Sequence, residues 1–112
     1  MWPFSGGAST TALAEVDVRE ALTRRQTGAK LIDVRSPEEF RRGHPKGAVN
    51  IPPQRLESST SGYRRDTEVL LICQSGQRSA RAARQLTDLG FTQVVNVRGG
   101  LKAWQRAGLP VK

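Results

Sequence analysis

The sequence predicts an α/β protein, built on an open, mainly parallel sheet of five strands with helices on both faces. Short apolar runs alternate with segments of helical periodicity along the 112 residues, and this alternation implies right-handed crossovers between parallel strands. Two of the runs, 30–34 and 68–72, are mostly apolar, as is typical of strands buried on both faces. We expect a flexible leader over residues 1–11 and a single domain over residues 12–112.

The first half of the chain is expected to hold two strands and two short helices. Asp17 is a suitable N-cap with Glu20 three residues later, and Gly28 is a suitable end for the helix that follows. Ser36 and Pro37 form a second helix start, because Ser caps a helix and Pro loses no needed donor at the first helical position. The expected elements are a weak strand at 12–16, a helix from 18 to about 28, a strand at 30–34 and a short helix from 37 that ends by 43.

The second half continues the alternation. Pro52 and Pro53 end the third strand, and the polar segment after them favours a loop with at most a short helix. Helical spacing places Ala82, Ala83 and Leu86 on one inward face. The expected elements are a strand at 47–51, the polar segment at 57–65, a strand at 68–72, a helix at 79–89, a strand at 94–97 and a helix at 101–107.

The composition is strongly basic, with 18 Lys and Arg against 10 Asp and Glu and a net charge of +8. This balance favours anionic partners, but we expect no nucleic-acid interface, because the arginines are spread without interleaved aromatic residues or a recognisable motif. The lack of a signal-peptide pattern or an apolar run of membrane-spanning length favours a cytoplasmic protein without membrane contact. Trp2 and Phe4 could anchor a partner, although such a leader is more often a frayed terminus.

The only cysteine, Cys73, ends the clearest strand and is followed by a Gly-containing loop and a helix. With one cysteine and one histidine, we expect no internal disulfide and no metal site. If residues 74–79 curl around the sulfur, their N–H groups and the positive end of the helix would stabilise a thiolate. Gly76 gives this loop backbone freedom. The segment indicates a nucleophilic cysteine; the alternative is an inert, buried one.

Other side chains near this loop are suited to binding an anion. The fork of Arg78 can hold two oxygens of an oxyanion, and Ser75 and Ser79 add hydroxyl donors. The alternative for Arg78 is an ion pair with a surface acid. Asp33 and Arg35 lie at the end of another predicted strand and therefore belong to the same carboxyl edge, where ligands of such sheets bind. A loop-stabilising pair explains these two residues as well as a catalytic role does.

Three segments together resemble the signatures of single-domain rhodaneses. LIDVRSPEEF at 31–40, followed by GH at 43–44 and GAVNIP at 47–52, resembles their N-terminal signature. CQSGQRSA at 73–80 resembles their active-site loop, and NVRGGLKAW at 96–104 resembles their C-terminal signature. The resemblance runs in order from about residue 16 to 111. One departure is Lys46 in a turn where the family usually has an apolar residue and Pro; it could add positive charge near the site or be a solvated loop lysine.

The resemblance implies a rhodanese-like fold and sulfurtransferase chemistry. A Cys73 thiolate would take the sulfane sulfur of thiosulfate or a persulfide and pass it to cyanide or a thiol, without a metal or organic cofactor. The expected partners are a small anionic sulfur donor, a thiol or cyanide acceptor and, as an option, a sulfur-trafficking protein. Cys73 is the expected catalytic residue; the expected substrate-binding residues are Gln74, Ser75, Gly76, Gln77, Arg78 and Ser79, with Asp33 and Arg35 in support.

Two other functions stay open. A persulfide carrier or regulatory module that acts through a protein partner would fit the small size of the chain. Rhodanese-fold phosphatases and arsenate reductases have one residue more between the cysteine and the arginine, which makes room for a tetrahedral oxyanion. The four residues between Cys73 and Arg78 favour sulfur transfer over this last class.

Overall fold

A computed structural model of the chain describes residues 13–112. The predicted leader at 1–11, with Trp2 and Phe4, lies outside the described residues. The elements, in chain order, are β1 (Glu15–Val16), α2 (Val18–Gln26), β2 (Lys30–Asp33), α3 (Pro37–Arg42), β3 (Val49–Asn50), the 3-10 turn η1 (Pro53–Arg55), α4 (Leu56–Ser59), β4 (Glu68–Ile72), α5 (Gln77–Asp88), β5 (Gln93–Val97) and α6 (Gly100–Arg106).

The five strands form one sheet in the order β1-β5-β4-β2-β3, and each neighbouring pair is parallel. This confirms the predicted five-stranded parallel sheet. β4 lies at its centre, where Asp33 of β2 pairs with Ile72 and Asn96 of β5 pairs with Leu71. The residues that follow β2 and β4 therefore meet at one carboxyl edge.

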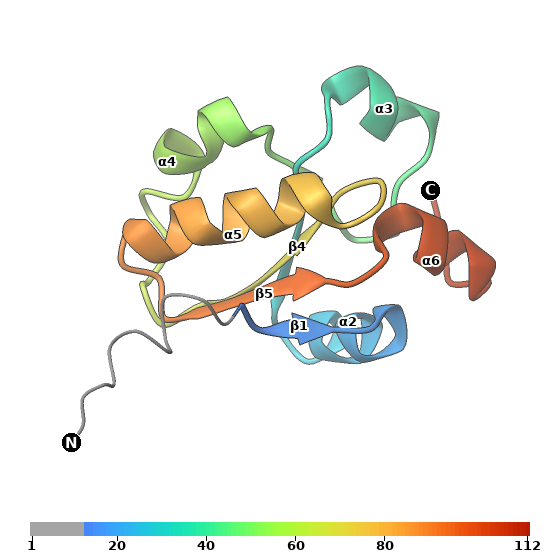
Figure 1. Cartoon of the computed structure of the whole chain (residues 1–112), viewed down its shortest axis with the longest axis horizontal. Coiled ribbons are helices and arrows are strands. Elements are labelled where there is room, and N and C mark those ends of the chain that lie inside the picture. Colours follow the sequence, from blue (N-terminus) through green and yellow to red (C-terminus); the bar gives the residue numbers. More distant parts are fainter. Residues whose placement is uncertain (1–12) are drawn as a thin grey trace.

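Helices cover both faces of the sheet, as the alternation along β4 requires. Val69 and Leu71 belong to a core layer with residues of α4 and α5, whereas Leu70 and Ile72 belong to a second layer with α2 and α6. In Figure 1, α4 and α5 lie on one side of the strands and α2 on the other. The longest helix, α5, has 12 residues, and none in the described part of the chain is both long and apolar enough to cross a membrane.

The strands at the two edges are shorter than the sequence pattern predicts. Of the described residues in the expected strand at 12–16, Glu15–Val16 alone pair with β5, and of the strand at 47–51, only Val49–Asn50 pairs with β2. At the second site the chain is still in a turn at Gly47, whose φ is 91°, and the N–H of Ala48 donates to the carbonyl of Pro45. An edge strand has one neighbour, so its length depends on pairing that local sequence does not encode.

Helix α5 begins two residues earlier than expected, at Gln77 rather than Ser79. Gly76 serves as its N-cap in the left-handed region, with φ 107° and no side-chain cap. Because glycine enters this region readily, the loop after Cys73 turns directly into the helix. The early start carries the first N–H groups of α5 close to the cysteine.

Candidate active site

Cys73 lies directly after β4, with 1% of its surface exposed. Three donors converge on its Sγ: the N–H of Gly76 at 3.1 Å, the N–H of Ser79 at 3.3 Å and the hydroxyl of Ser79 at 3.3 Å. These distances are suited to hydrogen bonds to sulfur. The loop curls around the sulfur, because Gly76 and the first turn of α5 aim their N–H groups at this one atom.

The surroundings of Cys73 favour its thiolate. Burial by itself raises the pKa of the thiol, but the hydrogen bonds from the hydroxyl and N–H of Ser79 and from the N–H of Gly76 lower it, and the net effect is a pKa below its ordinary value. The positive end of the 12-residue helix α5 acts in the same direction. A thiolate is the nucleophilic form of cysteine, so these contacts favour the reactive form of Cys73.

The start of α6 closes the cysteine loop from the other side. The N–H of Leu101 donates to the carbonyl of Cys73 at 2.8 Å, and the N–H of Lys102 donates to that of Gln74 at 3.1 Å. This approach requires Gly100: a Cβ there would lie 2.5 Å from the Cys73 carbonyl oxygen, and its φ is 61°. The sequence resemblance includes this glycine, but sequence reasoning gave it no role.

Asn96 is a buried site residue that sequence reasoning missed. Its Oδ1 accepts from the Ser79 hydroxyl at 2.6 Å, and its Nδ2 donates to the carbonyl of Gly76 at 3.2 Å and to Oε2 of Glu15 at 2.9 Å. Asn96 therefore holds two of the residues that surround the Cys73 sulfur. The available signal was a single polar residue inside the apolar run of β5.

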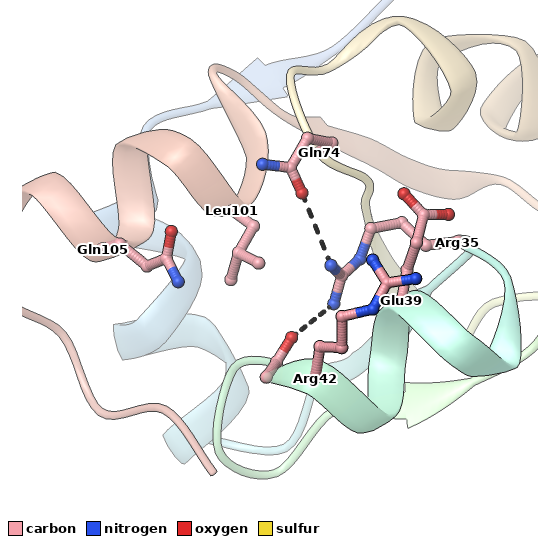
Figure 2. A pocket seen from close by; sticks show the side chains of 7 residues that line it. Arg35, Glu39, Arg42, Gln74, Leu101 and Gln105 are labelled. Atoms are coloured by element: carbon pink, nitrogen blue, oxygen red, sulfur yellow. Dashed lines mark hydrogen bonds between the residues drawn. The ribbon is translucent and has the colours of Figure 1, made fainter.

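Asp33 and Arg35 form a buried ion pair, 2.7 Å between Nη2 and Oδ2, with side chains 1% and 3% exposed. Arg35 also donates to the carbonyl of Gly43 at 2.7 Å and to Oε1 of Gln74 at 3.4 Å. Figure 2 shows this arginine between the loop that ends α3 and the cysteine loop. The pair therefore ties three segments together at the carboxyl edge, and its role in support of catalysis stays a prediction.

The side chain of Arg78 makes two bonds to Glu39 of α3, from Nη1 to Oε1 and from Nη2 to Oε2, each 2.9 Å long. The guanidinium of Arg78, together with the N–H of Ser36, lowers the pKa of Glu39 to about 2, and Glu39 in turn raises the pKa of Arg78. The structure thus shows the ion pair that was the alternative for Arg78. An anion-binding role for this fork stays a prediction, and Glu39 is a second residue that sequence reasoning missed.

A pocket of about 330 Å³ opens beside the cysteine loop. Figure 2 shows its lining, which comes from the segment between β2 and β3, from Gln74 and from α6. The lining residues are Arg35, Glu39, Arg42, Gly43, Gln74, Leu101 and Gln105. Ser75 and Gln77 are exposed at the tip of the loop. Within residues 13–112, no group of three His, Cys, Asp or Glu side chains gathers to hold a metal ion.

Comparisons with known proteins show what the whole domain is similar to. A family model described as "Rhodanese-like domain" matches residues 17–107. Senescence-associated protein DIN1 of Raphanus sativus is 36% identical over 117 residues, which cover 94% of this chain and 64% of that protein. Thiosulfate sulfurtransferase 16, chloroplastic, of Arabidopsis thaliana is 39% identical over 97 residues, with 76% and 81% covered. The structure of the human single-domain sulfurtransferase TSTD1 is similar with a TM-score of 0.74 at 29% identity, covering 85% and 97%.

The chain spans less than two thirds of the length of some of these relatives. It covers 64% of the Raphanus protein and 60% of a rhodanese-like domain-containing protein of Arabidopsis thaliana. The similarity therefore covers part of these relatives and does not by itself assign their activity to this chain.

Proposed function

Because the chain belongs to the rhodanese-like domain family, we propose that it is a sulfurtransferase that moves a sulfane sulfur from thiosulfate or a persulfide to a thiophilic acceptor through a persulfide on Cys73. The observation that carries the proposal is the convergence of two N–H groups and one hydroxyl on the Cys73 sulfur. Relatives named as thiosulfate sulfurtransferases support the same reaction class.

The proposed reaction has two sulfur transfers. The Cys73 thiolate attacks the outer sulfur of the donor; a new S–S bond forms at Cys73, and the donor's S–S bond breaks, with its electron pair leaving on sulfite or on a thiolate. A thiol or cyanide then attacks the outer sulfur of the Cys73 persulfide. The bond to Cys73 breaks and its electron pair returns to the cysteine sulfur, so the cycle needs no external oxidant or reductant.

Each part of the cysteine loop has a proposed role in this cycle. The N–H groups of Gly76 and Ser79 lie close enough to the sulfur to stabilise its negative charge before and after transfer. The rest of the loop, Gln74, Ser75 and Gln77, surrounds the outer sulfur, and Arg78 binds the charged end of an anionic donor. Asp33 and Arg35 hold the edge on which the loop rests.

The test is the formation of thiocyanate from cyanide and thiosulfate by the purified protein. We expect turnover by the wild type and none by Cys73→Ser, since the hydroxyl of serine is not ionised at neutral pH and forms no persulfide. The free energy of unfolding of both proteins is measured as well, so that loss of activity is separated from loss of fold. Activity that persists in Cys73→Ser would overturn the proposal.

A further inference from the structure

Glu39 and Arg78 join α3 to α5, and Glu39 also lines the pocket beside the cysteine loop. Both terminal nitrogens of Arg78 are bonded to Glu39, each at 2.9 Å. Glu39 is itself held in place, because its Oε1 also accepts from the N–H of Ser36 at 3.0 Å. The carboxylate is thus fixed by the cap of its own helix and does not simply follow the arginine.

This pairing affects any anion that uses the fork of Arg78. A planar guanidinium binds a carboxylate or an oxyanion with the same two parallel bonds, so an oxyanion and Glu39 compete for the same nitrogens. Glu39 also lines the pocket, where its negative charge repels an anionic donor. The other charged groups there are Arg42, which has no ion pair among the described residues, and Arg35, whose charge is matched by Asp33.

We propose that Glu39 is a specificity-determining residue that occupies the fork of Arg78 and thereby weakens the use of small dianionic donors such as thiosulfate relative to organic persulfides. An organic persulfide carries at most one charge at its sulfur and does not need two parallel bonds to oxygen. The inference rests on the proposed function and adds to it a preference between two classes of donor.

The variant Glu39→Gln tests the inference without removing the helix cap. Glutamine at this position still accepts from the N–H of Ser36, as in other capping boxes, but it lacks the charge and the second carboxylate oxygen that hold Arg78. We expect the KM for thiosulfate to fall by about three- to tenfold, since the competing ion pair is partly exposed and of modest strength, while kcat changes by less than about twofold. The kcat/KM for 2-hydroxyethyl persulfide should stay within about twofold of the wild type.

Glu38→Gln is the matched control. Glu38 precedes Glu39 on the same helix, is exposed and forms no ion pair within residues 13–112. Glu38→Gln removes the same charge one residue earlier in the chain but leaves the pair of Glu39 and Arg78 intact, so the KM for thiosulfate should be that of the wild type. An equal fall of KM in both variants would mean that general charge, not the hold on Arg78, sets the preference, and it would overturn the inference.

A binding measurement separates this inference from the proposed reaction. Thiosulfate is titrated calorimetrically into Cys73→Ser and into Cys73→Ser with Glu39→Gln, neither of which turns over. Tighter binding in the second protein supports the inference even if the wild type fails to form thiocyanate, in which case the proposed function alone fails. Equal or weaker binding overturns the inference whatever the turnover is. The gain in thiosulfate affinity should also vanish when Arg78→Ala is added, because the guanidinium that Glu39→Gln makes available is then absent.

Discussion

At the scale of single residues, the hydroxyl of Ser79 has one proton and two nearby acceptors. Oδ1 of Asn96 lies at 2.6 Å and Sγ of Cys73 at 3.3 Å. The amide of Asn96 is oriented by the acceptors of its Nδ2, namely Glu15 and the carbonyl of Gly76. When Cys73 is a neutral thiol, its S–H can donate to Ser79 while Ser79 donates to Asn96. When Cys73 is a thiolate, the Ser79 hydroxyl can donate its hydrogen bond to the sulfur instead.

The first prediction concerns this hydroxyl. The hydroxyl of Ser79 helps to lower the pKa of Cys73, so Ser79→Ala should raise the pH midpoint for alkylation of Cys73 by iodoacetamide. In the wild type the midpoint should lie below that of a free thiol, about 8.5. The measurement is the alkylation rate between pH 5 and 10. A midpoint that stays the same or falls in Ser79→Ala would show that the hydroxyl does not stabilise the thiolate.

The lowered pKa of Cys73 also has a consequence for stability. A group that loses its proton more easily in the folded state adds stability above its unfolded pKa, and this stability is lost as the pH falls through the folded pKa. The contribution of Cys73 should therefore increase as the pH rises between the two values. Urea unfolding of the wild type and of Cys73→Ser across that window measures it: the difference in free energy should grow with pH, and a constant difference would contradict the account.

At the scale of elements, the site depends on close approaches between segments that are distant in the sequence. α6 reaches the cysteine loop through Gly100, α3 reaches α5 through Glu39 and Arg78, and Arg35 connects β2 to the segment after α3. Local patterns predicted several elements well: β4 has the predicted bounds, and Ser36 caps α3 as predicted. Local patterns could not predict the contacts between elements, because these contacts depend on strand order and register.

The second prediction compares two glycines that both have positive φ. At Gly100 a Cβ would meet the backbone of Cys73 and Gln74 at 2.5–2.7 Å, whereas at Gly108 it would meet nothing within 4 Å. Gly100→Ala should lower the free energy of unfolding by about 2–4 kcal/mol, through backbone strain and overpacking together. Gly108→Ala should lower it by about 1–2 kcal/mol, through strain alone. Equal losses of unfolding free energy in the two variants would mean that the close packing of α6 against the cysteine loop does not contribute to stability.

The third prediction concerns the buried pair of Asp33 and Arg35. Arg35→Met leaves the carboxylate of Asp33 buried without its partner, so the free energy of unfolding should fall by about 3–5 kcal/mol. The matched control is Arg64→Met, because Arg64 pairs with Asp66 at the same spacing but with side chains 83% and 58% exposed. The control should leave the urea midpoint unchanged. Similar losses in both variants would contradict the role given to burial.

At the scale of the whole molecule, the sequence predicted the fold, whereas it left out several contacts that the structure shows around Cys73. The alternation of short apolar runs with helices was enough to predict a parallel sheet with two covered faces, because this prediction needs only the order of the elements along the chain. The cysteine loop was also predictable, since Cys73 and its donors lie within seven consecutive residues. Asn96 and Glu39 were not, because Asn96 lies 17 residues from Ser79 and Glu39 lies 39 residues from Arg78, and only the folded sheet brings them together.

The fourth prediction follows from the net charge of +8. A basic molecule attracts a dianionic donor before contact, and this attraction is screened over about 10 Å at 0.1 M salt. The kcat/KM for thiosulfate should therefore fall several-fold between about 0.02 and 0.3 M sodium chloride. The kcat/KM for 2-hydroxyethyl persulfide should fall less. Equal dependence on salt for the two donors would show that the charge of the molecule does not attract the donor.

The central claim, that Cys73 carries sulfur, is tested most directly by the intact mass of the protein. The mass is measured before and after treatment with thiosulfate or with 2-hydroxyethyl persulfide, and again after the addition of cyanide. Cys73→Ser is treated in parallel. The account predicts that the wild type gains the mass of one sulfur atom, that cyanide removes it as thiocyanate, and that Cys73→Ser gains nothing. A wild type that gains no sulfur from thiosulfate or from 2-hydroxyethyl persulfide, or a Cys73→Ser protein that does gain it, would contradict the account.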